Sequence, residues 1–406
     1  MEDTFLQQKG YLDLKSLVYS LVVVLYFAVI TAVNQVKSGV FSAAFYGVML
    51  LGALVFFSDK GALRLRPVLF IAFGAMILGI CNILFVGNLT WVLLIILMLS
   101  FLMAVFFLDG NIDENAFRMA MDVNALVITV KLLLHGKDAR VFVDTSNNYI
   151  SVHLLAPIVI YYSLLDARGK KAPLLPAVVS WVLSLWAGGR GGFLACTILL
   201  GGMLISRFFK DETTKRERII LAVVILLAMI PAIVIVVQSF LNRFSDLYVV
   251  SRFTDKGMDG GRRLECWIDY IRQTLESPGR ILFGTPLDEV PMAIYYEGNL
   301  HNAYLFVHVY LGLGGFIFVP FMFARAAIYA MRKKKWIYFW CIMAFAFRGL
   351  TDHVFGVNRL TVVVLALVFL PDIMGWKNKK KENTEGEKNA NFSSYSGTCG
   401  FQGDTQ

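Results

Sequence analysis

The stretch LVYSLVVVLYFAVITAV, from Leu17 to Val33, contains no charged side chain and decides the fold class of the chain. Its length approaches the roughly 20 apolar residues that a helix needs to cross a bilayer core about 30 Å thick. Similar apolar blocks recur along the chain as far as Met374. Because backbone groups in lipid must be paired within the spanning segment, helices are the expected elements. The sequence therefore predicts an all-α integral membrane protein.

The composition agrees with that class. The chain has 406 residues, of which 57% are hydrophobic, 14% aromatic and 17% charged. Soluble domains are about 45–50% apolar and about 25% charged, so the composition argues against an ordinary soluble protein. The formal net charge is +9, but the positive side chains form short clusters beside the apolar blocks, which is how membrane topology is encoded. The expected partner of these clusters is the lipid bilayer and not a nucleic acid.

We predict twelve spans. The fifth differs from the others because Asp122 and Lys131 interrupt it, and it is interpreted either as a full span or as a partial, re-entrant one. The twelve spans are Leu17 to Val33, Val40 to Phe57, Val68 to Val86, Leu89 to Leu108, Ala116 to Leu134, Tyr149 to Leu165, Pro173 to Ala187, Gly192 to Phe208, Ile219 to Gln238, Ala303 to Phe323, Trp336 to Leu350 and Val357 to Met374.

The distribution of Lys and Arg predicts the orientation. Most of them flank the spans on the side that carries both termini, which places the termini in the cytoplasm of a bacterial cell with a multi-pass chain in its inner membrane. The first apolar block lacks the features of a cleaved signal peptide and is expected to stay as an anchor. Residues 1–376 form one predicted transmembrane domain. Residues 377–406, which begin KNKKKENTEGEKN, are too polar to pack and are expected to be a disordered tail.

A glycine-flanked arginine connects two predicted spans in WAGGRGGFLA, from Trp186 to Ala195. Exposed backbone amides beside the Arg190 guanidinium would form a cradle for an anion. The same pattern suits a tight helix hairpin, in which glycines supply the turn and Arg190 reaches the lipid headgroups. Both interpretations place Arg190 on the outer side.

The longest predicted loop runs from Phe240 to His301, and connections of such length are usually functional or disordered. The part from Arg262 to Arg280 favours an ordered amphipathic helix across the outer mouth, because apolar side chains recur at three- and four-residue spacing. Acidic side chains outnumber basic ones in the loop, so an anion site there must depend on particular arginines. Arg262 and Arg263 directly follow the glycines of GMDGGRR. The apolar positions of the predicted helix are Leu264, Trp267, Ile268, Ile271 and Leu275.

The third motif is GNLHNAYLFVHVYLGLGG, from Gly298 to Gly315, where the loop returns to the membrane. On a continuous helix, His301, Tyr304 and His308 would form one stripe. A histidine at this boundary is suited to accept a proton or to donate a hydrogen bond near neutral pH. The alternative is an interfacial histidine with ordinary structural partners.

Together the three motifs resemble the O-antigen polymerase and O-antigen ligase superfamily of polytopic membrane glycosyltransferases. GGRGGFL is similar to the family's Ser/Gly-Arg-Gly-x-x-Leu motif, GGRRLECWIDYIRQTLESPGRILFG to its Gly-Arg-x-x-x-Trp helix, and HNAYLFVHVYLGLGG to its His-Asn-x-x-Leu…Gly motif. The similarity covers about residues 145–374. Gly189 stands where the family often has serine, and the segment Pro278 to Gly284 exceeds the family's Pro-x-x-Gly, so either Arg262 or Arg263 can align with the family arginine.

The resemblance implies transfer of a glycan from an undecaprenyl-pyrophosphate carrier to an acceptor hydroxyl. Arginines can stabilise the charge that a pyrophosphate leaving group gathers, which makes Arg190 and Arg262 the candidate catalytic cations, with Arg263 as the alternative. His301 is the candidate general base or orienting group. The candidate substrate contacts are Arg263, Asn302, Tyr304, His308 and Trp267.

No cofactor and no metal are expected. The first outer loop, NQVKSG, has no carboxylate, and no paired acidic motif follows a span as in metal-dependent lipid-linked transferases. The expected partners are a lipid-linked oligosaccharide donor and acceptor, with a flippase and a chain-length regulator as further candidates.

Three functions remain open. A polymerase would join lipid-linked repeat units in capsule, exopolysaccharide or O-antigen assembly, whereas a ligase would hand the glycan to a core lipid or a protein. The third is a transporter of an anion or a lipid-linked sugar, which would normally carry ionisable groups deep within its spans. Polymerase is the preferred function, because polymerases of these pathways are common in the superfamily.

Overall fold

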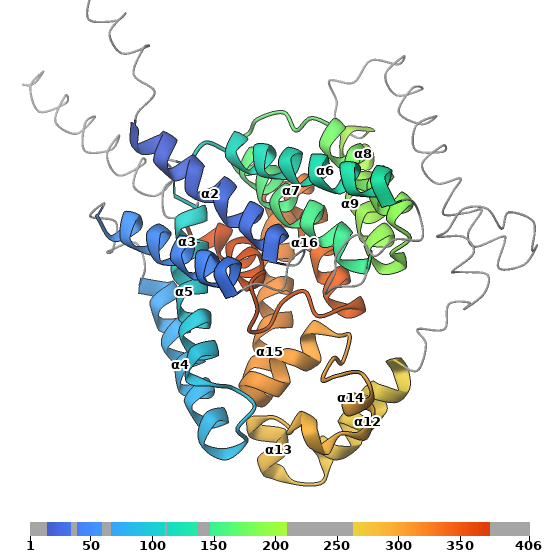
Figure 1. Ribbon diagram of the computed structural model, residues 1–406. Coiled ribbons are helices and arrows are strands. Elements are labelled where there is room, and N and C mark those ends of the chain that lie inside the picture. The colour runs from blue at the N-terminus through green and yellow to red at the C-terminus, as the bar shows by residue number, and fades with distance from the viewer. Residues whose placement is uncertain are drawn as a thin grey trace, which may run out of the picture.

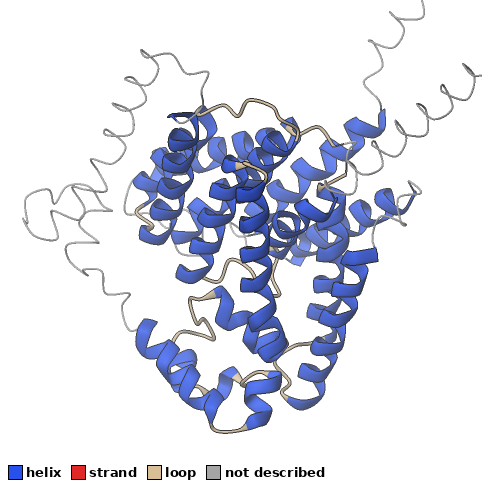
Figure 2. Cartoon of the chain, turned by 180° about the vertical axis from the view of Figure 1, so that it is seen from behind, coloured by secondary structure: helices blue, strands red, loops and turns tan. Residues whose placement is uncertain are grey.

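The computed structural model of the chain describes residues 14–33, 39–58, 66–109, 112–135, 147–208 and 263–373. Its regular elements are all helices, and no strand occurs among these residues (Figure 2). The predicted span Ile219 to Gln238, the outer loop from Phe240 through Arg262, and the predicted tail all lie outside the described residues.

Eleven described helices correspond to predicted spans. Most of their ends agree with the prediction within a few residues, and the exceptions are treated below. They are α2 (Leu14–Val33), α3 (Gly39–Ser58), α4 (Arg66–Phe85), α5 (Trp91–Phe107), α6 (Asn115–His135), α7 (Ile150–Ala167), α8 (Leu175–Ala187), α9 (Arg190–Phe208), α15 (Ala303–Arg332), α16 (Trp336–Thr351) and a final helix, Thr361–Ile373.

Five of these helices, α2, α4, α7, α9 and α15, are long and apolar enough to cross a membrane. Five shorter apolar stretches are the part of α3 from Gly39 to Leu54, α5, α8, α16 and the final helix. The described chain therefore has the character of an α-helical membrane protein. The helix α6 belongs to neither group, since Asp122 and Lys131 lie within it and Arg118 lies 3.7 Å from Asp122 on its exposed side.

Segments predicted to share the cytoplasmic side meet at one end of the bundle. Arg168 and Lys170, just after α7, both form ion pairs with Glu114, which precedes α6. Lys335, between α15 and α16, donates a hydrogen bond of 2.7 Å to the carbonyl oxygen of Asp166. These contacts place the start of α6, the end of α7 and the connection between α15 and α16 at the same end of the bundle.

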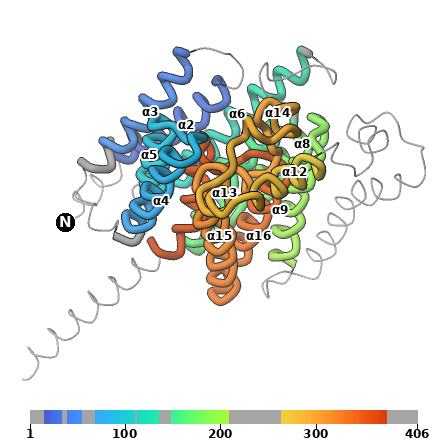
Figure 3. The backbone as a smooth tube through the Cα atoms, turned by 90° about the horizontal axis from the view of Figure 1, so that it is seen from below, coloured from blue at the N-terminus to red at the C-terminus, as the bar shows by residue number. Residues whose placement is uncertain are grey.

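The opposite end carries three short helices: α12 (Arg263–Leu275), α13 (Pro278–Phe283) and α14 (Pro291–Tyr295). They gather at the bottom of Figure 1, and the view from below shows them in front of α15 and α16 (Figure 3). Cys266 and Tyr270 of α12 pack in a small core with Val290, Ala293 and Leu300. We call this end of the bundle, where α7, α9 and α15 begin and α16 ends, the site end.

The helix α12 is present where the spacing predicts one, but it is shorter than the predicted stretch to Arg280. Ser277 is extended and caps α13 ahead of Pro278, which stops α12 at Leu275. Among the five predicted apolar positions, Trp267 is the one that packs inward; the other four, Leu264, Ile268, Ile271 and Leu275, are exposed. An exposed apolar row of this kind is typical of helices that lie in a membrane interface.

The helix α15 runs to Arg332, beyond the predicted end at Phe323, because the following residues are good helix formers. It is kinked at Gly312, whose φ of 59° lies in the left-handed region. A side chain at Gly312 would collide with the carbonyl group of Leu282, so the absence of a Cβ lets α13 dock into the kink.

The final helix begins at Thr361, four residues later than predicted, so the predicted start at Val357 is wrong. The Asn358 side chain accepts a hydrogen bond of 2.9 Å from the Leu360 amide, and the Thr361 hydroxyl accepts one of 3.1 Å from the Asn358 amide. These bonds hold residues 352–360 as a non-helical segment at the site end.

Candidate functional site

His301 lies in the turn before α15 and not on the helix, so the predicted stripe with Tyr304 and His308 is wrong. Its φ is 51°, a left-handed conformation that is uncommon for a residue other than glycine and often marks functional sites. The Asn299 side chain accepts a hydrogen bond of 2.8 Å from the His301 amide. Asn302 caps α15 by accepting bonds of 3.0 and 3.2 Å from the amides of Tyr304 and Leu305. The turn is thus fixed from both sides.

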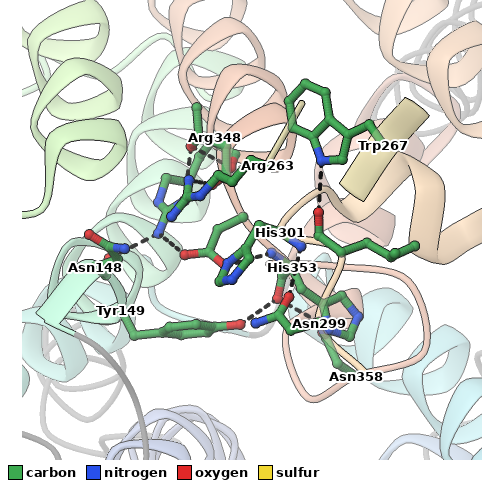
Figure 4. Close-up of polar contacts among 12 residues, drawn as sticks. Asn148, Tyr149, Arg263, Trp267, Asn299, His301, Arg348, His353 and Asn358 are labelled. Atoms are coloured by element: carbon green, nitrogen blue, oxygen red, sulfur yellow. Dashed lines mark hydrogen bonds and ion pairs between the residues drawn. The ribbon is translucent and has the colours of Figure 1, made fainter. Parts of the chain in front are cut away.

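Trp267 of α12 also holds this turn. Its indole N–H donates a hydrogen bond of 2.7 Å to the carbonyl oxygen of Leu300, the residue before His301 (Figure 4). Trp267 was predicted to be a substrate contact, and the structure gives it a partner within the protein. The loop helix α12 therefore positions His301 through one directed bond.

The imidazole of His301 faces a buried carboxylate. Its Nδ1 lies 3.5 Å from Oδ1 of Asp352, whose side chain is 2% exposed, whereas the His301 side chain is 21% exposed. Nδ1 itself is buried and makes no closer hydrogen bond within the described residues. The exposed part of the ring therefore does not include Nδ1. A proton on Nδ1 would face the carboxylate, which leaves Nε2 as the nitrogen that can accept a proton.

Asp352 is held by Arg348, which lies one turn earlier on α16. The Arg348 side chain is 1% exposed and lies 3.1 Å from the second carboxylate oxygen. It also donates hydrogen bonds of 2.9 Å to the Thr351 hydroxyl and to the carbonyl oxygen of Asn148, before α7. A buried ion pair of this kind needs such additional bonds to offset its desolvation. Arg348 therefore fixes the carboxylate that faces His301.

Arg263, at the start of α12, reaches the same turn. Its guanidinium donates a hydrogen bond of 2.8 Å to the carbonyl oxygen of Thr351, and Figure 4 shows it beside Arg348. Arg262, which the sequence favoured slightly as the catalytic arginine, lies outside the described residues. Of the two candidates, Arg263 is the one whose position is known.

The Arg190 motif packs against this turn through Gly191. A Cβ atom on Gly191 would lie 2.5 Å from the Thr351 hydroxyl oxygen, which leaves no room for a side chain. Arg190 itself is the first residue of α9 and is partly buried. The starts of α9 and α12 and the end of α16 therefore meet at Thr351.

The electrostatics of the site follow from these contacts. Burial raises the pKa of Asp352, but the charge of Arg348, the His301 contact and the charge of Arg263 act in the opposite direction and leave this pKa well below its usual range. The carboxylate is therefore ionised at neutral pH. It can orient the His301 ring and stabilise the imidazolium that forms when Nε2 takes a proton.

The remaining predicted contacts lie away from this cluster. The Tyr304 hydroxyl donates to the carbonyl oxygen of Ala346, on α16, at 3.1 Å. Both ring nitrogens of His308 have partners: Nδ1 lies 2.6 Å from the Tyr270 hydroxyl and Nε2 lies 3.0 Å from the carbonyl oxygen of Ile281. His308 thus ties α12 and α13 to α15. The structure gives both residues internal partners and does not bring them to the Asp352 turn.

Arg348 and Asp352 are not among the residues predicted from the sequence. Arg348 did offer a signal, since it is a charged residue inside the predicted span Trp336 to Leu350, and such residues are functional candidates by default. Asp352 follows the same span directly. Its pairing with His301 joins positions far apart in the chain, which no local pattern shows.

The described residues contain no group of three or more His, Cys, Asp or Glu side chains that could hold a metal ion. No protein-family model matches the chain, and no curated protein matches it either. The resemblance to the polymerase and ligase superfamily thus depends on the three motifs, and a function must be argued from the geometry of the site.

Proposed function

We propose that the chain is a membrane glycosyltransferase of the polymerase type. It transfers an undecaprenyl-pyrophosphate-linked glycan onto a hydroxyl of a second lipid-linked repeat unit at the outer face of a bacterial inner membrane. In the proposed topology the chain spans the membrane twelve times and keeps both termini in the cytoplasm. The observation that carries the proposal is the meeting of His301, Asp352 and Arg263 at one turn.

In the proposed reaction His301 is the general base. The acceptor hydroxyl loses its proton to Nε2 while its oxygen bonds to the anomeric carbon of the donor glycan. The bond from that carbon to the pyrophosphate oxygen breaks, and the pyrophosphate leaves on its lipid carrier. Asp352 stabilises the resulting imidazolium through Nδ1, which lies 3.5 Å away. The proton on His301 then returns to solvent.

The proposed cations for the leaving pyrophosphate are Arg263 and Arg190. Guanidinium groups bind phosphate oxygens through paired N–H donors and stay charged at every physiological pH. Arg263 is anchored to Thr351 and the Arg190 motif packs on the same residue. This arrangement supports two cations that approach one site from different helices, with Arg262 adjacent in the chain.

Product size distinguishes polymerase from ligase. Deletion of the gene should leave glycans of a single repeat unit if the protein is a polymerase. Long chains that stay on their lipid carrier would instead identify a ligase and contradict the proposed acceptor. Complementation with the unaltered chain is the control, and gel separation of the extracted lipid-linked glycans is the measurement.

A further inference from the structure

A polar cavity of about 290 Å³ lies at the site end and has no role in the proposed reaction described above. Its polar lining is Tyr46 of α3, Tyr149 before α7, and His353, Asn358 and Arg359 of the non-helical segment. Apolar residues of α2 and α5 complete the wall. The volume is close to the lower limit of about 300 Å³ for ligand pockets, which suits a compact head group.

Arg359 gives this cavity a positive charge. Within the described residues no carboxylate lies at ion-pair distance from Arg359, and its guanidinium carbon lies 5.7 Å from the centre of the Phe45 ring. By contrast, Arg325 and Arg348 pair with Asp372 and Asp352. The guanidinium has a hydrogen bond to Tyr46 and a contact with the Phe45 ring, but neither partner is a carboxylate. Part of its desolvation cost is therefore left for a bound anion to offset.

The cavity also holds a fixed frame of polar groups. The Tyr149 hydroxyl donates a hydrogen bond of 2.7 Å to the carbonyl oxygen of His353, and the side-chain amide of Asn358 donates one of 3.3 Å to the same oxygen (Figure 4). The ring of His353 stacks on Phe306 with 3.6 Å between centroids. Its Nε2 is buried and has no hydrogen-bond partner in the described part of the chain. A ligand that accepts a hydrogen bond would satisfy this nitrogen.

Other residues of the same segment line an apolar groove. The groove has a volume of about 420 Å³ and runs between α4 and α15, with Phe355, Gly356 and Thr361 in its wall. The helix α5 contributes to both spaces, through Leu93 and Ile96 on the polar side and Leu97 and Phe101 on the apolar side. The ligand that suits both spaces has an anionic head and a long apolar chain.

We propose that this cavity holds the phosphate of the acceptor lipid, with its hydrocarbon chain in the groove between α4 and α15. This inference rests on the proposed function, in which Arg263 and Arg190 already receive the donor pyrophosphate. His353 directly follows Asp352, so the acceptor phosphate lies beside the His301 pair and apart from the leaving group. Two lipid-linked substrates would thus be bound at the same time by different arginines.

Native mass spectrometry of the purified full-length chain in a phosphate-free detergent tests this inference by counting bound lipids. With undecaprenyl pyrophosphate as the probe, the unaltered protein should bind two molecules. Arg359→Gln should bind one molecule. The affinity of its altered Arg359 site should fall by about tenfold or more, since a hydrogen bond to a charged group contributes about 1.5–3 kcal/mol. Undecaprenol, which has no charge, should not fill the Arg359 site.

Two variants control for folding. Arg332→Gln changes an exposed arginine at the far end of α15 and should keep both molecules bound. Arg359→Lys keeps the charge and should bind more tightly than Arg359→Gln at the second site. If Arg359→Gln still binds two molecules with unchanged affinity, the inference is wrong.

The same experiment separates this inference from the proposed function. Arg263→Gln should lose the molecule bound at the donor site. If this variant still binds two molecules, that result counts against the proposed donor site and not against the Arg359 site. Phosphatidylglycerol is the second probe. If it fills the Arg359 site as well as undecaprenyl pyrophosphate does, the cavity is a general phospholipid site and the acceptor assignment is overturned.

Discussion

His301 Nδ1 and Asp352 Oδ1 lie 3.5 Å apart, although one residue precedes α15 and the other follows α16. Because the two helices run in opposite directions, the start of one and the end of the other lie at the same end of the bundle. Arg348 fixes the carboxylate, and Trp267 fixes the turn that carries the histidine. The loop helix and the bundle are thus joined at the site.

Trp267→Phe should lower activity by about tenfold with little loss of stability. The variant keeps an aromatic ring but removes the N–H bond to Leu300, and a small shift of a catalytic group is costly to the rate. Trp181→Phe is a matched control. The indole N–H of Trp181, on α8, donates a hydrogen bond of 3.0 Å to the hydroxyl of Thr197, on α9. Equal rates for the two variants would show that Trp267 does not position His301.

Gly191→Ala should disturb the site, because the added Cβ would lie 2.5 Å from the Thr351 hydroxyl. We expect activity to fall by more than tenfold. Gly201→Ala, on the same helix α9, has no heavy atom within 4 Å of its added Cβ and should keep normal activity. Transfer rates at equal protein abundance measure both, and full activity of Gly191→Ala would show that the contact tolerates a shift.

Arg348→Met should destabilise the protein by about 3–5 kcal/mol, since it leaves the Asp352 carboxylate buried without its partner. The double variant Arg348→Met with Asp352→Asn should recover much of this loss but stay inactive, because the charge facing His301 is gone. Thermal unfolding in detergent and transfer activity measure the two effects separately. An active double variant would exclude the carboxylate from the mechanism.

Acidification should destabilise the protein through His353. Burial lowers the pKa of His353 to about 4. The charge of Asp352 raises this pKa and the charge of His301 lowers it, but both effects are smaller than that of burial. A histidine in the unfolded chain has a pKa near 6.5. The stability that comes from keeping His353 neutral is therefore fully present above about pH 6.5. This contribution is lost as the pH falls toward 4. The melting temperature of His353→Phe should therefore fall less than that of the unaltered protein between pH 7 and pH 4, and parallel curves would contradict this.

Transfer should survive chelation. The proposed reaction uses His301 as base and arginines as the cations, with no step that requires a metal ion. Activity in excess EDTA should equal activity with added magnesium. Loss of transfer in EDTA that magnesium or manganese restores would show the mechanism to be wrong.

Much of the helical framework was predictable because apolar blocks and helix ends are local properties. The kink at Gly312 and the late start of the final helix at Thr361 were not, since docking of α13 and the side-chain bonds of Asn358 decide them. The sequence also indicated His301 and Arg263. It could not indicate Asp352 as the partner of His301, because that contact depends on how α15 and α16 pack.

The most direct test is transfer by the purified protein with one defined lipid-linked repeat unit as both donor and acceptor. The unaltered chain should release undecaprenyl pyrophosphate and form a ladder of polymers, whereas His301→Ala should form none while keeping its melting temperature. A normal ladder from His301→Ala at equal protein concentration would contradict the account.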